Sequence, residues 1–102
     1  MATFIPKTGV TQEIPPPTST REIARLLGLE RNQEPTRYED YQGATWWFWR
    51  IGNDVRQKNQ RACDLLRRRT HFVSILGDAI YMSPEESGTV RESFPVGATT
   101  RV

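Results

Sequence analysis

The sequence is poor in the residues that build covalently linked or metal-held folds. Cys63 is the only cysteine and His71 is the only histidine. One thiol excludes an intrachain disulfide, and one cysteine with one histidine supplies too few soft ligands for a structural zinc site. An unpaired thiol is typical of a reducing compartment. We therefore expect an intracellular protein that carries neither a metal nor a cofactor.

Long apolar runs are also missing. The first 20 residues contain no apolar stretch like that of a secretory signal, and nowhere does the chain approach the roughly 18–20 apolar residues of a membrane-spanning helix. We therefore expect a protein that is not secreted and that has no transmembrane helix.

Strong core-forming residues are scarce. Leu, Ile, Val and Phe make up 22 of the 102 residues, close to the roughly 20% below which disorder becomes the default. The length allows one domain, because domains usually run to about 100–150 residues. The composition thus predicts one small core and no deep active-site cavity.

No arrangement of catalytic groups emerges. A nucleophile needs a base within reach, and Cys63 and His71 would lie roughly 12 Å apart along one helix. The acidic pairs at 39–40 and 85–86 are adjacent in sequence, so their side chains would diverge on a helix. A glycine-rich phosphate loop is absent from the sequence. We predict a protein that is not an enzyme and has no small-molecule substrate.

A short helix is predicted over about 19–28. Ser19 and Glu22 form a capping box, in which each side chain accepts from an amide of the first turn. Gly28 then supplies the left-handed residue that ends a helix.

The segment 19–29 also resembles the first helix and turn of helix-turn-helix DNA-binding domains. Ala24 occupies the mid-helix position and Gly28 the turn position of that pattern. The resemblance implies a second, recognition helix. Glu34 would then stand where that helix needs an apolar anchor, and Pro35 would interrupt it.

A longer helix is predicted over about 36–76. It begins with a second capping box, Thr36 with Glu39. Apolar residues then recur at alternating steps of three and four, the spacing of one helix face. Gly52 would kink this helix.

The turn-forming residues 52–54 leave another interpretation open. In this alternative, residues 44–51 form a strand, and Asp54 caps a helix that begins at Val55. The continuous helix is the interpretation that we adopt.

Both ends of the chain are predicted to be extended. Residues 1–18 form a Pro-rich arm with three consecutive prolines, and residues 83–102 form a short helical turn followed by an extended tail. The expected fold class is therefore mainly α, with a helical region over 19–82 between two arms. We do not expect a compact independent domain.

Four consecutive aromatic residues stand out in the middle of the chain. On a helix they would cover every face, so at least two would point away from the chain's own apolar seam. They would then meet a partner, or they would pack in a local core on Ile23, Leu26 and Leu27. Both explanations stay open.

Arginine is the other unusual feature, with 12 Arg against 2 Lys. Residues 50–69 carry seven basic and two acidic groups, a net charge of +5. Arginine forms bidentate pairs and is common at binding hot spots, as is tryptophan. The residues expected to bind partners are Trp46, Trp47, Phe48, Trp49, Arg50, Arg56, Arg61, Arg67, Arg68 and Arg69.

These features predict a non-catalytic accessory or structural subunit of a larger multiprotein complex. In general build the chain is similar to accessory subunits of respiratory-chain assemblies. That resemblance implies protein subunits as partners, association with the mitochondrial inner membrane, and peripheral contact with anionic lipid. The alternative is a small nucleic-acid-binding regulator that uses the helix-turn-helix-like segment and the basic segment 50–69.

Overall fold

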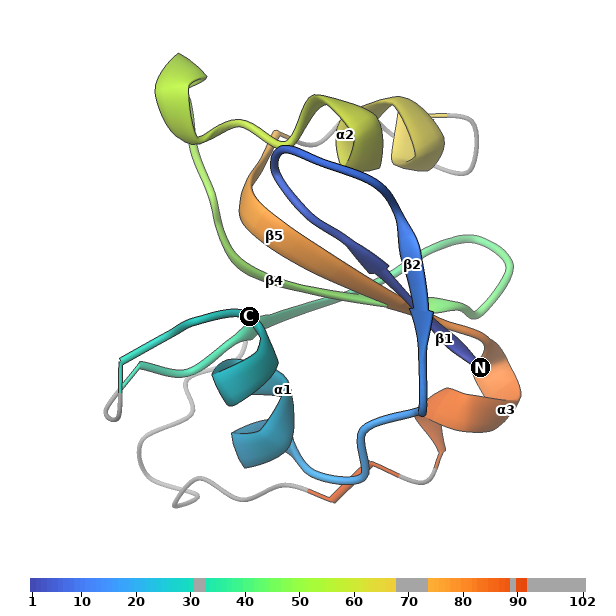
Figure 1. Cartoon of the computed structure of the whole chain (residues 1–102). Coiled ribbons are helices and arrows are strands. Elements are labelled where there is room, and N and C mark those ends of the chain that lie inside the picture. The colour runs from blue at the N-terminus through green and yellow to red at the C-terminus, as the bar shows by residue number, and fades with distance from the viewer. Residues whose placement is uncertain (31–32, 68–73, 89, 92–102) are drawn as a thin grey trace.

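The centre of the structure is an antiparallel sheet (Figure 1). The structure, a computed structural model, describes residues 1–30, 33–67, 74–88 and 90–91, with only the backbone of Arg67. Within these residues five strands form one sheet in the order β2-β1-β5-β4-β3. The strands are β1 (Ala2–Ile5), β2 (Gln12–Ile14), β3 (Thr36–Glu39), β4 (Thr45–Ile51) and β5 (Ile75–Met82).

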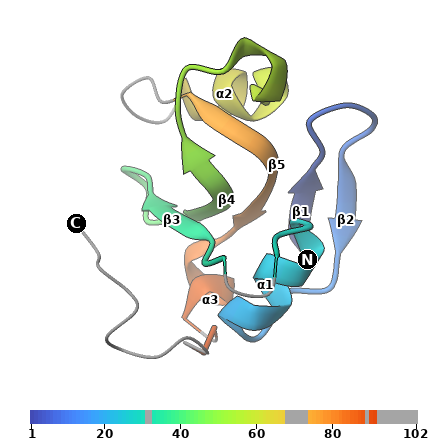
Figure 2. The ribbon, with the colours of Figure 1, turned by 90° about the vertical axis from the view of Figure 1, so that its left-hand side faces the viewer.

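Short helices lie on both sides of this sheet. Helix α2 (Gln60–Arg67) lies on one side, and α1 (Thr20–Leu26) and α3 (Pro84–Ser87) lie on the other (Figure 2). A 3-10 helix, η1 (Val55–Gln57), connects β4 to α2. The described part of the chain contains no helix that is long and apolar enough to span a membrane.

The mainly α fold class predicted from the sequence is wrong. The described residues form five antiparallel strands in one sheet, and the helices among them are short. The radius of gyration is 12.6 Å, close to the roughly 13 Å of a folded domain of about 100 residues. The chain is therefore a compact globule, and the expectation that it lacks a compact fold is corrected as well.

The long helix predicted over 36–76 is replaced by β3, β4, η1, α2 and β5, and its part at 68–73 lies outside the described residues. The physical reason is that β4 is buried on both faces. Trp46 and Phe48 join the core under α2, while Trp47 joins the core on the α1 side. A strand covered on both sides needs apolar residues at consecutive positions. The alternative interpretation, a strand over 44–51, was the correct one.

The capping box predicted at Thr36 and Glu39 is not formed. These residues begin and end β3, where they pair with Phe48 and Thr45 of β4. The Thr36 hydroxyl donates to the carbonyl oxygen of Trp49 at 2.9 Å, so it serves a cross-strand contact. The recognition helix implied by the helix-turn-helix resemblance is likewise not seen in the described residues 33–39, because β3 occupies most of that stretch.

The predicted N-terminal arm belongs to the sheet. β1 pairs with both β2 and β5, so residues 2–5 lie between two other strands. The extended conformation expected here is present, but it is part of the folded domain. The predicted C-terminal tail beyond residue 91 lies outside the described residues.

The cap at Ser19 and the glycine that ends α1 are confirmed, but only the Ser19 half of the predicted capping box is formed, because the Glu22 carboxylate accepts from the Thr18 amide at 3.0 Å. The Ser19 hydroxyl accepts from the Glu22 amide at 3.2 Å, and Gly28 adopts a φ of +73° after α1. The amides of Gly28 and Leu29 donate to Arg25 and Ala24 at 3.0 Å, which closes a Schellman turn. These interactions are local, which is why the sequence revealed them.

The start of α3 is also confirmed as a capping box, between Ser83 and Glu86, and Gly88 ends the helix after one turn. The Glu86 carboxylate lies 2.8 Å from the α-amino group of Met1. That hydrogen bond lowers the pKa of Glu86 and raises the pKa of the α-amino group. The contact joins the start of β1 to α3.

Asn59 ties α2 to the sheet. Its side chain is fully buried, and its amide nitrogen donates to the carbonyl oxygens of Ile5 at 2.8 Å and Gly77 at 2.9 Å. Its amide oxygen accepts from the Ala62 backbone at 3.0 Å and so caps α2. Every polar atom of this buried side chain is therefore paired.

We predict that Asn59→Ala lowers the free energy of unfolding by about 2–4 kcal/mol, because the helix loses its cap and two buried carbonyls lose their donor. Asn59→Asp keeps the cap but places a carboxylate against both carbonyls, so it should cost at least as much. Urea denaturation measures both changes.

The control is Asn53→Ala, because Asn53 is exposed in the loop after β4. This change should stay within about 0.5 kcal/mol of the wild type. Equal losses at the two asparagines would contradict the role given to Asn59.

Candidate functional site

Three of the ten residues expected to bind partners are buried in the core. Trp46 is 1% exposed, Trp47 5% and Phe48 0%. Trp47 packs with Ile23 and Leu27, which confirms the local-core explanation in part. Leu26 is exposed, and Trp46 and Phe48 pack in the other core, under α2. These three side chains therefore offer no surface to a partner in this fold.

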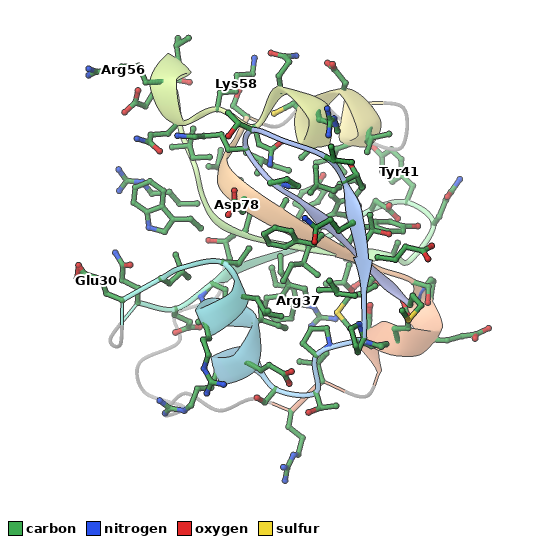
Figure 3. The ribbon with its side chains drawn as sticks, viewed as in Figure 1. Glu30, Arg37, Tyr41, Arg56, Lys58 and Asp78 are labelled. Atoms are coloured by element: carbon green, nitrogen blue, oxygen red, sulfur yellow. The ribbon has the colours of Figure 1, made fainter. Side chains whose placement is uncertain are left out.

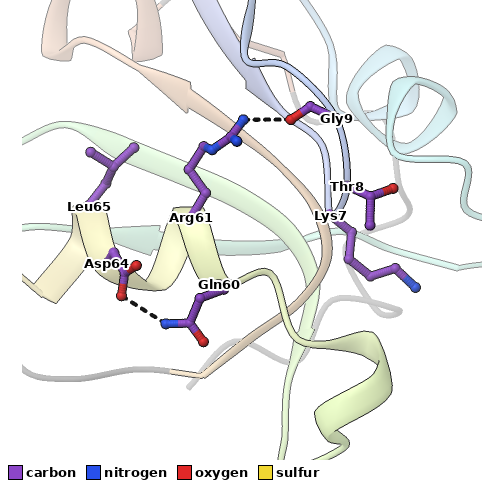
Figure 4. A pocket seen from close by; sticks show the side chains of 7 residues that line it. All are labelled: Lys7, Thr8, Gly9, Gln60, Arg61, Asp64 and Leu65. Carbon is purple, nitrogen blue, oxygen red and sulfur yellow. Dashed lines mark hydrogen bonds between the residues drawn. The ribbon is translucent and has the colours of Figure 1, made fainter.

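Arg61 is committed to a contact within the chain. Its guanidinium donates to the Gly9 carbonyl at 2.6 Å (Figure 4). It also donates to the Thr11 hydroxyl at 3.2 Å. It holds the loop between β1 and β2 against α2. An open pocket of about 390 Å³ lies beside this contact. The side chains of Gln60 and Asp64 also line this pocket, and the Gln60 amide nitrogen donates to the Asp64 carboxylate at 2.8 Å.

The other predicted residues divide into two groups. The side chain of Arg67, and all of Arg68 and Arg69, lie outside the described residues. Trp49 and Arg50 lie near the end of β4, where their side chains are in contact, and Arg56 lies in η1, which follows β4 in the chain.

A β-bulge shapes this end of the sheet. Phe48 pairs with Ala79 and Arg50 with Leu76, so Trp49 alone lies opposite two residues of β5, Gly77 and Asp78. Gly77 adopts a φ of +81°, a conformation that favours glycine. Bulges redirect side chains and are common beside functional sites. Here the bulge coincides with the point at which β4 passes from the core to the surface.

Hydrogen bonds support the bulge on both sides. The Asp78 carboxylate accepts from the Lys7 backbone amide at 2.7 Å, and Asn59 donates to the Gly77 carbonyl as described above. The Lys7 ammonium donates to the carbonyl of Arg56 and to the side chain of Gln57, both at 3.3 Å. The bulge, the loop after β1 and η1 are thus linked to one another.

A groove of about 410 Å³ lies along this supported end. Lys7, Trp49, Gln57 and the bulge residues form one part of its lining, and residues 27–29 at the end of α1, together with Gln33, form the other part. The Schellman turn places Leu27 in the core and Leu29 at the groove. We call this feature the Trp49 groove.

Exposed apolar and cationic side chains follow the lining residue Trp49 in the chain. The Arg50 guanidinium lies 4.2 Å from the centre of the Trp49 ring, a cation–π contact. Ile51 is 53% exposed and Val55 is 83% exposed. Arg56 extends into solvent and makes only a loose contact of 3.9 Å with Asp54 among the ion pairs described. The Trp49 tip consists of Trp49, Arg50, Ile51, Val55 and Arg56.

The lining of the groove includes one basic and one acidic residue, Lys7 and Asp78. Figure 3 places Arg56 near the top of one side of the molecule and Glu30 about halfway down that side, with Asp78 between them in height.

The described residues contain no cluster of three or more His, Cys, Asp or Glu side chains that could hold a metal. Cys63 lies on the buried face of α2, where its sulfur accepts from the Ile75 amide at 3.3 Å. His71 lies outside the described residues.

Comparison of the chain with known protein families, curated proteins and solved structures gives no match.

Sequence reasoning missed Lys7, Asp78 and Gly77 as parts of this site. Lys7 and Asp78 are 71 positions apart in the chain, so no local pattern connects them. Gly77 carried a usable signal, because an isolated glycine inside a strand pattern suggests a bulge. The predicted helix over 36–76 instead uses this glycine as the residue that ends the helix.

We predict that Gly77→Ala lowers stability by about 1–2 kcal/mol, because an L-residue is strained at this φ. The added methyl group would meet the Trp49 Cβ at 3.7 Å, an ordinary contact, so the cost comes from the backbone. Urea denaturation measures the loss, and the NMR signal of the Trp49 indole N–H should shift.

Gly88→Ala is the matched control, because Gly88 has an ordinary φ of −69° and room for a methyl group. That variant should keep both the wild-type stability and the wild-type Trp49 signal. An unchanged Trp49 signal in Gly77→Ala would contradict the proposed link between the bulge and the groove.

Proposed function

We propose that this chain is a non-catalytic subunit of a larger multiprotein assembly and that it binds a neighbouring protein through the Trp49 tip. The observation that supports the proposal is the exposure of Ile51 and Val55, which follow the contacting Trp49–Arg50 pair in the chain. Tryptophan and arginine are the residues most enriched at protein-binding hot spots, and neighbouring apolar side chains exclude water from them. A compact fold means that the subunit can fold before it docks.

The binding surface in this proposal is not the surface predicted from the sequence. An Arg-rich helix carrying four aromatic side chains is not formed, and only Trp49 of the aromatic cluster reaches the surface. The Arg50 contact holds the indole in place, which reduces the side-chain entropy lost on binding. Binding energy would therefore be concentrated on a few fixed side chains.

Nucleic acid is the second candidate partner. The net charge of +5 over residues 50–69 favours it, because cationic side chains neutralise phosphates. Asp78 in the groove opposes it, because its carboxylate would repel a phosphate backbone. The protein partner is therefore the first proposal, and contact with anionic lipid would use the same cations.

The first test uses a valine pair. Val55 in the tip and Val10 in the loop between β1 and β2 are both largely exposed, at 83% and 75%. Tagged wild type, Val55→Asp and Val10→Asp are expressed in the native host, and the proteins that co-purify in fixed stoichiometry are quantified by mass spectrometry. We expect Val55→Asp to lose them by about tenfold or more and Val10→Asp to retain them.

Trp49→Ala should behave like Val55→Asp, because removing a hot-spot tryptophan costs about 2 kcal/mol or more of binding. Equal retention by all variants would contradict docking through the tip. Co-purified nucleic acid whose binding weakens steeply with salt would instead support the second candidate.

A further inference from the structure

The outer edge of β3 is a surface that the proposed function does not use. We infer that two copies of this chain pair through β3, with the two strands antiparallel and related by a two-fold axis at Tyr38. The pairing joins the five-stranded sheets of the two copies into one continuous sheet. It does not involve the Trp49 tip, so the inference goes beyond the proposed function.

The main chain of β3 is open on one side. Figure 2 shows β3 at one margin of the sheet, where it pairs with β4 and with none of the other described strands. The Asp40 amide, directly after β3, donates to the Ala44 carbonyl oxygen at 2.9 Å, so the Asp40 main chain faces the β4 side. Main-chain groups alternate in direction along a strand, so those of Arg37 and Glu39 face the open margin. They are therefore placed to form a further antiparallel ladder.

Arg37 and Glu39 also place opposite charges along this margin. Residues two positions apart in a strand lie on the same face of the sheet. The two side chains are 49% and 61% exposed, and the Arg37 Nη2 atom lies 4.0 Å from the Glu39 Oε1 atom, which is a loose contact. A facing strand therefore meets one positive and one negative side chain.

The order of these charges selects one register. The groups that face the margin allow three antiparallel alignments of two copies: Arg37 opposite Arg37, Glu39 opposite Glu39, or Arg37 opposite Glu39. The first two alignments place like charges opposite each other, which disfavours pairing. In the third, each Arg37 lies opposite the Glu39 of the other copy, and these residues exchange main-chain hydrogen bonds.

The same register places Tyr38 opposite its own copy. Tyr38 lies on the other face of the sheet, where it is half-buried and packs against the core under α2. Aromatic side chains that face each other across two strands favour the pairing of those strands. The tyrosine pair therefore supports the same alignment as the two charge pairs.

The opposite margin of the sheet lacks this self-complementarity. β2 forms that margin, and its one charged residue is Glu13. Two copies of β2 would bring only negative charges together, whatever their register. Charged side chains at a sheet edge generally oppose pairing with other strands. A two-fold contact requires a surface that matches itself, and the charges of β3 meet that requirement.

Sedimentation equilibrium of the full chain tests the inference. Because a strand of four residues buries little surface, we expect a reversible wild-type dimer with a Kd between about 1 µM and 1 mM. Arg37→Glu and Glu39→Arg should each weaken this association by about tenfold or more, because each variant places like charges opposite each other. Both side chains are exposed, so the fold should be retained, which circular dichroism verifies.

The decisive sample is an equimolar mixture of Arg37→Glu and Glu39→Arg. One chain then carries two negative charges at these positions and the other carries two positive charges, so we expect a heterodimer with at least the wild-type affinity. The double variant, with both substitutions in one chain, restores opposite charges across the two strands and should form a homodimer again. A monomeric mixture, or a double variant that associates no better than the single variants, would overturn the inference.

Glu13→Arg is the matched control, because Glu13 is an exposed glutamate on the other edge strand. This variant should keep the wild-type association, and so should Val55→Asp, because Val55 belongs to the tip. Loss of the dimer in either control, or its persistence in both single variants of β3, would place the contact elsewhere and refute the inference. A wild type that stays monomeric up to about 1 mM would also refute it and would leave the proposed function intact.

Discussion

Burial of β4 on both faces is the constraint on which the rest of the structure depends. Trp46 and Phe48 fill the core under α2, and Trp47 fills the core on the α1 side. Each side chain of this size contributes about 1.5–3 kcal/mol when it leaves water. In a chain with few core-forming residues, one strand that supplies both cores accounts for much of the apolar burial. Helices α1 and α2 then need only cover the two faces of β4.

The candidate site forms where that two-sided burial ends. Beyond Phe48 the bulge at Gly77 shifts the register, and Trp49 passes from the core to the surface. Asn59 links this same bulge to α2 and to β1. The groove is therefore supported by the bonds that hold the sheet together, and a ligand would meet a surface that is already ordered.

Sequence patterns were reliable for interactions that close within one turn of chain. The caps at Ser19 and Ser83 and the glycine that ends α1 were all predicted correctly. The pattern at Thr36 and Glu39 shows the limit of this reasoning, because the same residue types form a strand when β4 lies beside them. The apolar spacing over 36–76 likewise fitted a helix, and the strand alternative differed from it only in contacts distant in sequence.

By itself the sequence determined the local events: where two helices begin, where α1 ends, and that the aromatic cluster needed cover on all sides. It also determined the basic character of residues 50–69. Only the tertiary structure decided that this cover comes from the chain's own helices and that Trp49 alone of the cluster reaches the surface. It also brought Lys7 to Asp78, because sheet order and bulge register depend on pairing between strands far apart in the chain, which no local spacing encodes.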